Sequence, residues 1–120
     1  MNEKVIYFDN AATTRIHRPV IEEMLPFYET YYGNPSSVYN FGVQVKSAIE
    51  DSRKKMAGLL GVDPKELFFT SGATEADNWA VYGAVRKNSH KGKHIITSTI
   101  EHHAVLHPFK DLEKEGYEVT

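Results

Sequence analysis

The stretch FFTSGATEADNW, residues 68–79, is central to the fold prediction because it changes from strand-like to helix-like sequence within a few residues. Its bulky apolar start is typical of a buried strand, and the small residues 71–74 form a turn into a predicted helix. Such a corner either closes a strand-to-helix turn or exposes backbone N–H groups that bind phosphate. The spacing alone favours the simple turn, and it matches neither the nucleoside-triphosphate loop nor the dinucleotide fingerprint.

Strand-like and helix-like segments alternate from this corner onward. A strand–helix–strand order joins parallel strands through right-handed crossovers, so the second half of the chain predicts an α/β fold. We expect strands at 66–70, 94–98 and 117–120, and helices from 73 or 74 to about 87 and at about 101–115.

The first half of the chain predicts two helices separated by loops. Pro19 suits the first turn of a helix that Pro26 should bend, since proline inside a helix removes a hydrogen bond. A second helix covers about 41–60, where apolar residues recur at helical spacing, and Gly61 is placed as its left-handed stop. The other expected features are a strand or extended segment at 4–8, loops at 9–14 and 33–37, and a turn at Asp63-Pro64.

Composition limits the class of protein. The 120 residues suffice for one modest domain, and a net charge of −2 without charge clusters argues against binding nucleic acid. The absence of cysteine removes disulfides, thiolate metal sites and a thiol nucleophile. No secretory signal and no apolar run of about 18 residues is present, so we expect no membrane partner and a cytoplasmic location.

Three histidines, His102, His103 and His107, fall at the start of the helix that follows the strand at 94–98. This is the carboxyl edge of the predicted sheet, where ligands bind. His102 and His103 project about 100° apart and cannot both face one ion, and His103 with His107 makes an incomplete zinc site. We therefore expect no metal, interpret His103 and His107 as surface residues, and leave a role for His102 in ring stacking or proton exchange open.

Two polar loops carry side chains that could recognise a carboxylate. The first holds Asn10 and Thr13, and the second holds Asn34 beside two serines. Taken singly, each loop is better explained by side chains that satisfy the backbone of a turn.

Five segments occur in a fixed order along the chain. They are YFDNAATT at 7–14, YGNPSS at 32–37, FTSGATEADN at 69–78, IEHHAVL at 100–106 and EKEGYEVT at 113–120. Together they resemble the start of the cysteine desulfurases, the NifS/IscS-like branch of the class V aminotransferases that use pyridoxal phosphate. The resemblance covers essentially the whole chain.

The resemblance implies the N-terminal part of a fold type I pyridoxal-phosphate enzyme, with a mostly parallel sheet and helices on both faces, incomplete in this chain. Residues 1–14 would then be the N-terminal segment of a small domain. Residues 15–120 would begin the large cofactor-binding domain. The family works as a homodimer.

The resemblance also implies roles for single residues. Ala73 and Thr74 lie where the family holds the cofactor phosphate, through a backbone N–H and the threonine hydroxyl, which reverses the preference for a simple turn. His102 corresponds to the histidine that stacks on the pyridine ring and shuttles protons. Asn34 and the loop with Ala12 and Thr13 lie where the family approaches its amino-acid substrate.

The implied reaction takes sulfur from L-cysteine, gives alanine and an enzyme persulfide, and supplies a sulfur acceptor or scaffold protein in iron–sulfur cluster or thiolation pathways. The sequence departs from the family at the reacting groups, because it has no Ser-x-x-His-Lys segment for the Schiff-base lysine and no cysteine. We therefore expect a chain that is inactive by itself, truncated or complemented by a second polypeptide. The alternatives are a non-catalytic remnant or interaction module, or a fragment of a selenocysteine lyase or class V aminotransferase.

Overall fold

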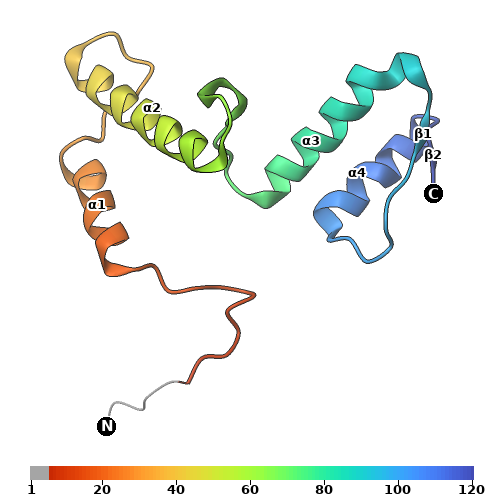
Figure 1. Ribbon diagram of the computed structural model, residues 1–120, viewed down its shortest axis with the longest axis horizontal. Helices are drawn as coiled ribbons and strands as arrows, with labels where there is room; N and C mark the ends of the chain where they lie inside the picture. Colours follow the sequence, from red (N-terminus) through yellow and green to blue (C-terminus); the bar gives the residue numbers. More distant parts are fainter. Residues whose placement is uncertain (1–5) are drawn as a thin grey trace. The chain divides into compact units, whose positions relative to one another are not determined.

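A computed structural model describes residues 6–120 and divides the chain into two compact units (Figure 1). The first unit ends at Leu67, and the second covers Phe68–Thr120. Of the strand or extended segment expected at 4–8, residues 4 and 5 lie outside the described residues, and residues 6–8 belong to no helix or strand.

The first unit contains the two predicted helices, α1 (Arg18–Glu29) and α2 (Asn40–Leu60). Pro19 lies in the first turn of α1, where its missing N–H costs no helical hydrogen bond, and Pro26 lies inside the helix as predicted. Helix α2 ends at Gly61, whose φ of 70° is left-handed. The predicted glycine stop is confirmed.

The loop between α1 and α2 folds tightly onto the first turn of α2. Gly42 is buried, and a Cβ atom there would clash with the carbonyl oxygen of Asn34 and with Ser37. The ring of Tyr32, on the other side of this loop, meets Phe41 edge-on at a centroid distance of 5.0 Å. Position 42 therefore requires glycine, because the loop approaches the helix backbone closely there. This contact holds the loop against the first turn of α2.

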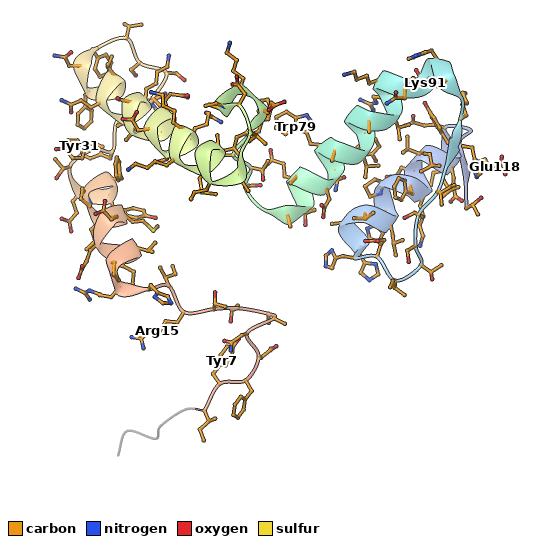
Figure 2. All side chains as sticks on the ribbon, viewed as in Figure 1. Tyr7, Arg15, Tyr31, Trp79, Lys91 and Glu118 are labelled. Carbon is orange, nitrogen blue, oxygen red and sulfur yellow. The ribbon has the colours of Figure 1, made fainter. Side chains whose placement is uncertain are left out.

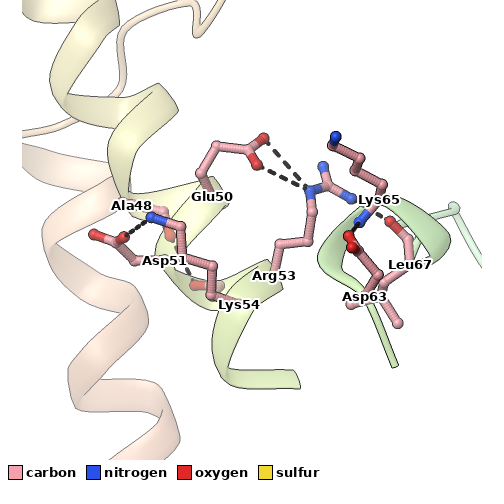
Figure 3. A network of polar contacts seen from close by, with 9 residues as sticks. Ala48, Glu50, Asp51, Arg53, Lys54, Asp63, Lys65 and Leu67 are labelled. Carbon is pink, nitrogen blue, oxygen red and sulfur yellow. Dashed lines mark hydrogen bonds and ion pairs between the residues drawn. The ribbon is translucent and has the colours of Figure 1, made fainter. Parts of the chain in front are cut away.

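A short 3-10 helix, η1 (Pro64–Glu66), follows α2 at the predicted Asp63-Pro64 turn. The Asp63 carboxylate accepts from the N–H of Lys65, and the Glu66 carboxylate accepts from the N–H of Asp63. Arg53 on α2 donates to the carbonyl of Leu67 just beyond η1 (Figure 3). The first two bonds close the turn of η1, and the bond from Arg53 joins the end of this turn to α2.

The strand predicted at 66–70 does not form, and that prediction was wrong. Glu66 belongs to η1, and residues 67–70 lie in no strand. Leu67 has the extended backbone of a strand (φ −100°, ψ 125°), but its carbonyl accepts from the guanidinium of Arg53 instead of a neighbouring strand. Sequence pattern gave the extended conformation, whereas a strand also needs a partner to complete its hydrogen bonds.

The second unit is a helix followed by a parallel strand–helix–strand crossover. Its elements are α3 (Ala73–Asn88), a 3-10 helix η2 (Ser89–Lys91), β1 (His94–Ile95), α4 (His103–Lys114) and β2 (Glu118–Val119). β1 and β2 pair in parallel, with His94 opposite Glu118 and Ile95 opposite Val119. The parallel pairing and the helical crossover are those of the predicted α/β fold, although both strands are shorter than expected.

Helices α3 and α4 pack against each other and form the core of the second unit. The buried residues of α4, Ala104, Pro108 and Leu112, recur every four positions and so line one face of the helix. Leu112 is 0% exposed. Figure 2 shows side chains of both helices in the space between them. None of the helices within residues 6–120 combines the length and apolar character needed to cross a bilayer.

Candidate functional site

The corner at residues 70–75 begins α3 without a side-chain cap. Gly72 is the N-cap residue, and neither Ser71 nor Thr70 caps the helix with its side chain. The φ of Gly72 is 164°, extended backbone that any residue adopts, and a Cβ there would have no atom within 4 Å. Neither the backbone conformation nor crowding requires glycine at this position. Because no atom lies within 4 Å of that Cβ position, the space next to Gly72 is open.

Hydrogen-bond donors of the first turn face this open space. Ala73 and Thr74 are exposed, and within residues 6–120 their backbone N–H groups and the Thr74 hydroxyl donate to no protein acceptor. The helix dipole adds a partial positive charge at the same end. The arrangement therefore fits an anionic group of the size of a phosphate.

The carboxylate of Glu75 modifies this corner. It accepts from the backbone N–H of Ser71 at 2.6 Å and from the Ser71 hydroxyl at 2.7 Å. These two bonds hold the pKa of Glu75 below its ordinary value, and the bond from the Ser71 backbone has the larger effect. The donors of Ser71 are thus already used, and Ala73 and Thr74 remain for a ligand.

Phe68 connects the corner to the body of α3. Its ring meets Trp79 at a centroid distance of 5.0 Å in an edge-on arrangement, and Trp79 projects from the side of the helix (Figure 2). The chain entering the corner is therefore folded back along α3.

His102 is the N-cap residue of α4, one residue before the helix begins. Its Nδ1 accepts from the backbone N–H of Ala104 at 3.1 Å. In the neutral ring, Nδ1 as acceptor leaves the proton on Nε2, and the side chain is exposed. A ring held in this way presents a donor outward in a fixed tautomer.

The two neighbouring histidines, His103 and His107, lie on the surface, as predicted. His103 and His107 share a face of α4, with ring centroids 5.2 Å apart and nearly parallel planes, and both are exposed. In the part of the chain that the structure describes, no group of three or more histidine, cysteine, aspartate or glutamate side chains is arranged to hold a metal ion.

Asn78 is a residue that the sequence reasoning missed. Its half-buried side chain donates from Nδ2 to the Thr74 carbonyl at 2.8 Å and to the Ala104 carbonyl at 3.1 Å. One amide therefore links the first turn of α3, with Thr74, to the first turn of α4, next to His102. A signal was present in the sequence, because an asparagine four residues after Thr74 lies on the same helix face.

The remaining predicted residues, Asn34, Ala12 and Thr13, belong to the first unit. Asn34 Oδ1 accepts from the N–H of Ser36 at 2.9 Å and so closes a turn, whereas Asn34 Nδ2 donates to no acceptor within residues 6–120. Ala12 donates its N–H to the carbonyl of Asp9, and the hydroxyls of Thr13 and Tyr7 share a hydrogen bond. The turn interpretation fits both loops, and their approach to a substrate stays a prediction.

The model of the class V aminotransferase family matches residues 6–120. The chain belongs to this family. Its membership confirms the resemblance drawn from the five ordered segments.

The relatives are cysteine desulfurases. The cysteine desulfurase IscS of Methanosarcina thermophila is 54% identical over 117 residues, 98% of this chain and 29% of that protein. A solved structure of a NifS-like protein has 44% identity and a TM-score of 0.90, covering 96% of this chain and 32% of its own. A structure described as SspA in complex with cysteine has 38% identity and a TM-score of 0.86, with 95% and 33% coverage.

These matches confirm the predicted fold. The chain spans between 29% and 33% of the length of these proteins, so the matches concern only that part of each of them.

Proposed function

We propose that this chain supplies the phosphate-binding and ring-facing part of a cysteine desulfurase that uses pyridoxal phosphate. The observation that carries the proposal is the open start of α3, where the donors of Ala73 and Thr74 are unused. The 54% identity to a cysteine desulfurase supports it, as does the likeness to a structure that holds cysteine.

Pyridoxal phosphate, when bound, supplies an electron sink for the substrate carbon. The residues of this chain hold and orient it. The N–H of Ala73 and the N–H and hydroxyl of Thr74 bind the phosphate, whose charge the α3 dipole favours. His102 would face the cofactor ring and would hold or move a proton at Nε2, because its Nδ1 already accepts from the N–H of Ala104.

The loops of the first unit serve the substrate in this proposal. Asn34 Nδ2 is a free amide donor suited to the carboxylate of L-cysteine, since Oδ1 already accepts from Ser36. The loop with Ala12 and Thr13 borders the same substrate. Residues 1–14 form part of a small domain, and residues 15–120 begin the large one.

The groups absent from these 120 residues come from elsewhere in the working enzyme. A Schiff-base lysine and a cysteine nucleophile would be supplied by another segment or by a complementing polypeptide, and the assembly would be a homodimer. The product sulfur passes to an acceptor or scaffold protein as a persulfide.

A chimaera tests this function directly. Residues 1–120 replace the matching segment of the Methanosarcina thermophila desulfurase, and the purified protein is assayed for bound pyridoxal phosphate by absorbance and for alanine formed from L-cysteine. We expect both. Thr74→Val should weaken cofactor binding by about 10- to 100-fold, because a hydrogen bond to a charged group contributes roughly 1.5–3 kcal/mol. Thr74→Ser keeps the hydroxyl and should retain the cofactor.

A folded chimaera without cofactor, or equal cofactor affinity in Thr74→Val, would contradict the proposal. An inactive chimaera, together with binding of the 120-residue chain to the intact relative, would instead support an interaction module. Faster turnover of L-selenocysteine than of L-cysteine would support a selenocysteine lyase.

A further inference from the structure

Pro108 leaves a vacancy in the hydrogen-bond ladder of α4. It lies inside the helix and is buried, and it has no N–H to donate to the carbonyl four residues earlier. That carbonyl belongs to Ala104, which is also buried at 6% exposure. A buried carbonyl without a partner destabilises a protein by about 1–3 kcal/mol, so the vacancy needs a donor from outside the helix.

The donor comes from α3. Asn78 Nδ2 lies 3.1 Å from the Ala104 carbonyl oxygen, and it also donates to the Thr74 carbonyl at 2.8 Å. Both hydrogens of the amide are thus used, one within α3 and one across to α4. The proline in one helix and the asparagine in the other form a matched pair.

From this geometry we infer that Asn78 is a positioning residue that sets His102 relative to Thr74. The connection runs through three hydrogen bonds: Thr74 carbonyl to Asn78, Asn78 to the Ala104 carbonyl, and the Ala104 N–H to His102 Nδ1. The tether between helices stands on the structure alone. Its consequence for the cofactor rests on the proposed function.

Positioning of this kind has a large effect on catalysis. A displacement of about 1 Å between groups that hold a reactant can lower the rate about 100-fold. Asn78 donates to the carbonyls of Thr74 and Ala104, so its effect on the proposed phosphate donors and on the imidazole is transmitted through these two residues.

The tether is tested first in the 120-residue chain by a double-mutant cycle, with urea unfolding as the measurement. Asn78→Ala should lower the folding equilibrium constant about fivefold or more, because it leaves the Ala104 carbonyl unpaired. In a Pro108→Ala background the effect should shrink to less than about twofold, because the new N–H at position 108 satisfies that carbonyl within the helix. Equal effects in both backgrounds would overturn the tether.

Asn88→Ala is the matched control. Asn88 makes the same bond within α3, from Nδ2 to the carbonyl of Ala84 at 2.8 Å, and among the described residues its side chain makes no bond to α4. Asn88→Ala should change the folding equilibrium constant by the same factor with and without Pro108→Ala. A coupling as large as that of Asn78→Ala would overturn the pairing of Asn78 with Pro108.

The positioning role is tested in the chimaeric holoenzyme. Asn78→Ala should lower kcat about tenfold and speed cofactor loss, with less than a twofold change in KM for L-cysteine, whereas Asn88→Ala should match the parent. Adding Pro108→Ala should restore stability without restoring kcat, because the carbonyl is satisfied but the two helices stay untethered. If the double variant recovers kcat together with stability, Asn78 has only a structural role and the inference is overturned.

The two proposals fail separately. A parent chimaera without cofactor would overturn the proposed function and the role of Asn78 toward the cofactor. The cycle in the 120-residue chain would still decide whether Asn78 joins α3 to α4.

Discussion

The two units of the chain hold their candidate residues in different ways. In the second unit, one side-chain bond joins Asn78 to Ala104, 26 positions away on another helix. In the first unit, the bonds made by the candidate residues are local, from Asn34 to Ser36 and between Thr13 and Tyr7. The second unit therefore fixes the mutual placement of its candidates by a bond between helices. In the first unit, the side chains of the candidates fix the shape of their own loops.

Burial differs in the same sense. Leu112 and Pro108 are the largest fully buried side chains among the described residues, and both belong to α4. The buried residues of α2, Gly42 and Ala57, are small. Little apolar area stabilises the first unit by itself, since the hydrophobic contribution scales with the area removed from water.

Truncating the core of the second unit should give the largest effect. Leu112 is 0% exposed, and Leu112→Ala should destabilise the second unit by about 2–5 kcal/mol through lost burial and the cavity left behind. Hydrogen exchange of the amides of α3 and α4 measures this loss.

Leu59→Ala is the control from the first unit, because Leu59 is 85% exposed. Its effect should stay within about 0.5 kcal/mol. Equal destabilisation by the two substitutions would remove the contrast in packing between the units.

Replacing His102 comes next in size and separates the ring from the cap. In the chimaera, His102→Ala should lower kcat about 100-fold, a typical contribution of a positioned proton-transfer group. His102→Asn keeps an N-cap acceptor for the N–H of Ala104 but removes the imidazole, so it should be equally slow. Steady-state kinetics with L-cysteine provide the measurement.

In the first unit, Asn34→Ala should raise KM for L-cysteine with a smaller change in kcat.

Two outcomes would contradict the role of His102. If His103→Ala slows turnover instead of His102→Ala, the wrong histidine has been assigned. If His102→Asn restores turnover, the cap and not the ring is what matters.

The smallest effect concerns the charge of Glu75. Its folded-state pKa is lowered by the bonds from Ser71, so the stabilisation is present above the ordinary value of 4.5 and is lost as pH falls through the lowered pKa. The Ser71 amide resonance, followed by NMR, should therefore titrate with a midpoint below 4.5. Glu75→Gln should abolish this titration, and a midpoint at or above 4.5 would contradict the bonds to Ser71.

Much of this fold was predictable from local sequence. The helical spacing of α2 and the glycine after it gave both its extent and its stop, because these depend on neighbouring residues. The parallel pairing of β1 and β2 followed from the strand–helix–strand order.

The parts that failed depend on contacts that local pattern does not contain. The segment 66–70 has strand-like composition, yet the carbonyl of Leu67 is bound by Arg53 from 14 positions away. The bonds of Ser71 at the start of α3 were not foreseen either, because its N–H and hydroxyl both donate to Glu75, one turn into the helix. Asn78 was missed because its bond to the Ala104 carbonyl forms only once α4 packs against α3.

The β1–α4–β2 crossover also bears on the order of folding. Its ends meet where His94 Nε2 and the Thr120 hydroxyl lie 2.8 Å apart, a separation of 26 positions in sequence. Closing so short a loop has a small entropic cost, and contacts of low sequence separation form quickly. At a synthesis rate of about 5–20 residues per second, the crossover has time to fold soon after β2 leaves the ribosome, and the N-terminal end of α3 then acquires its neighbour α4 early.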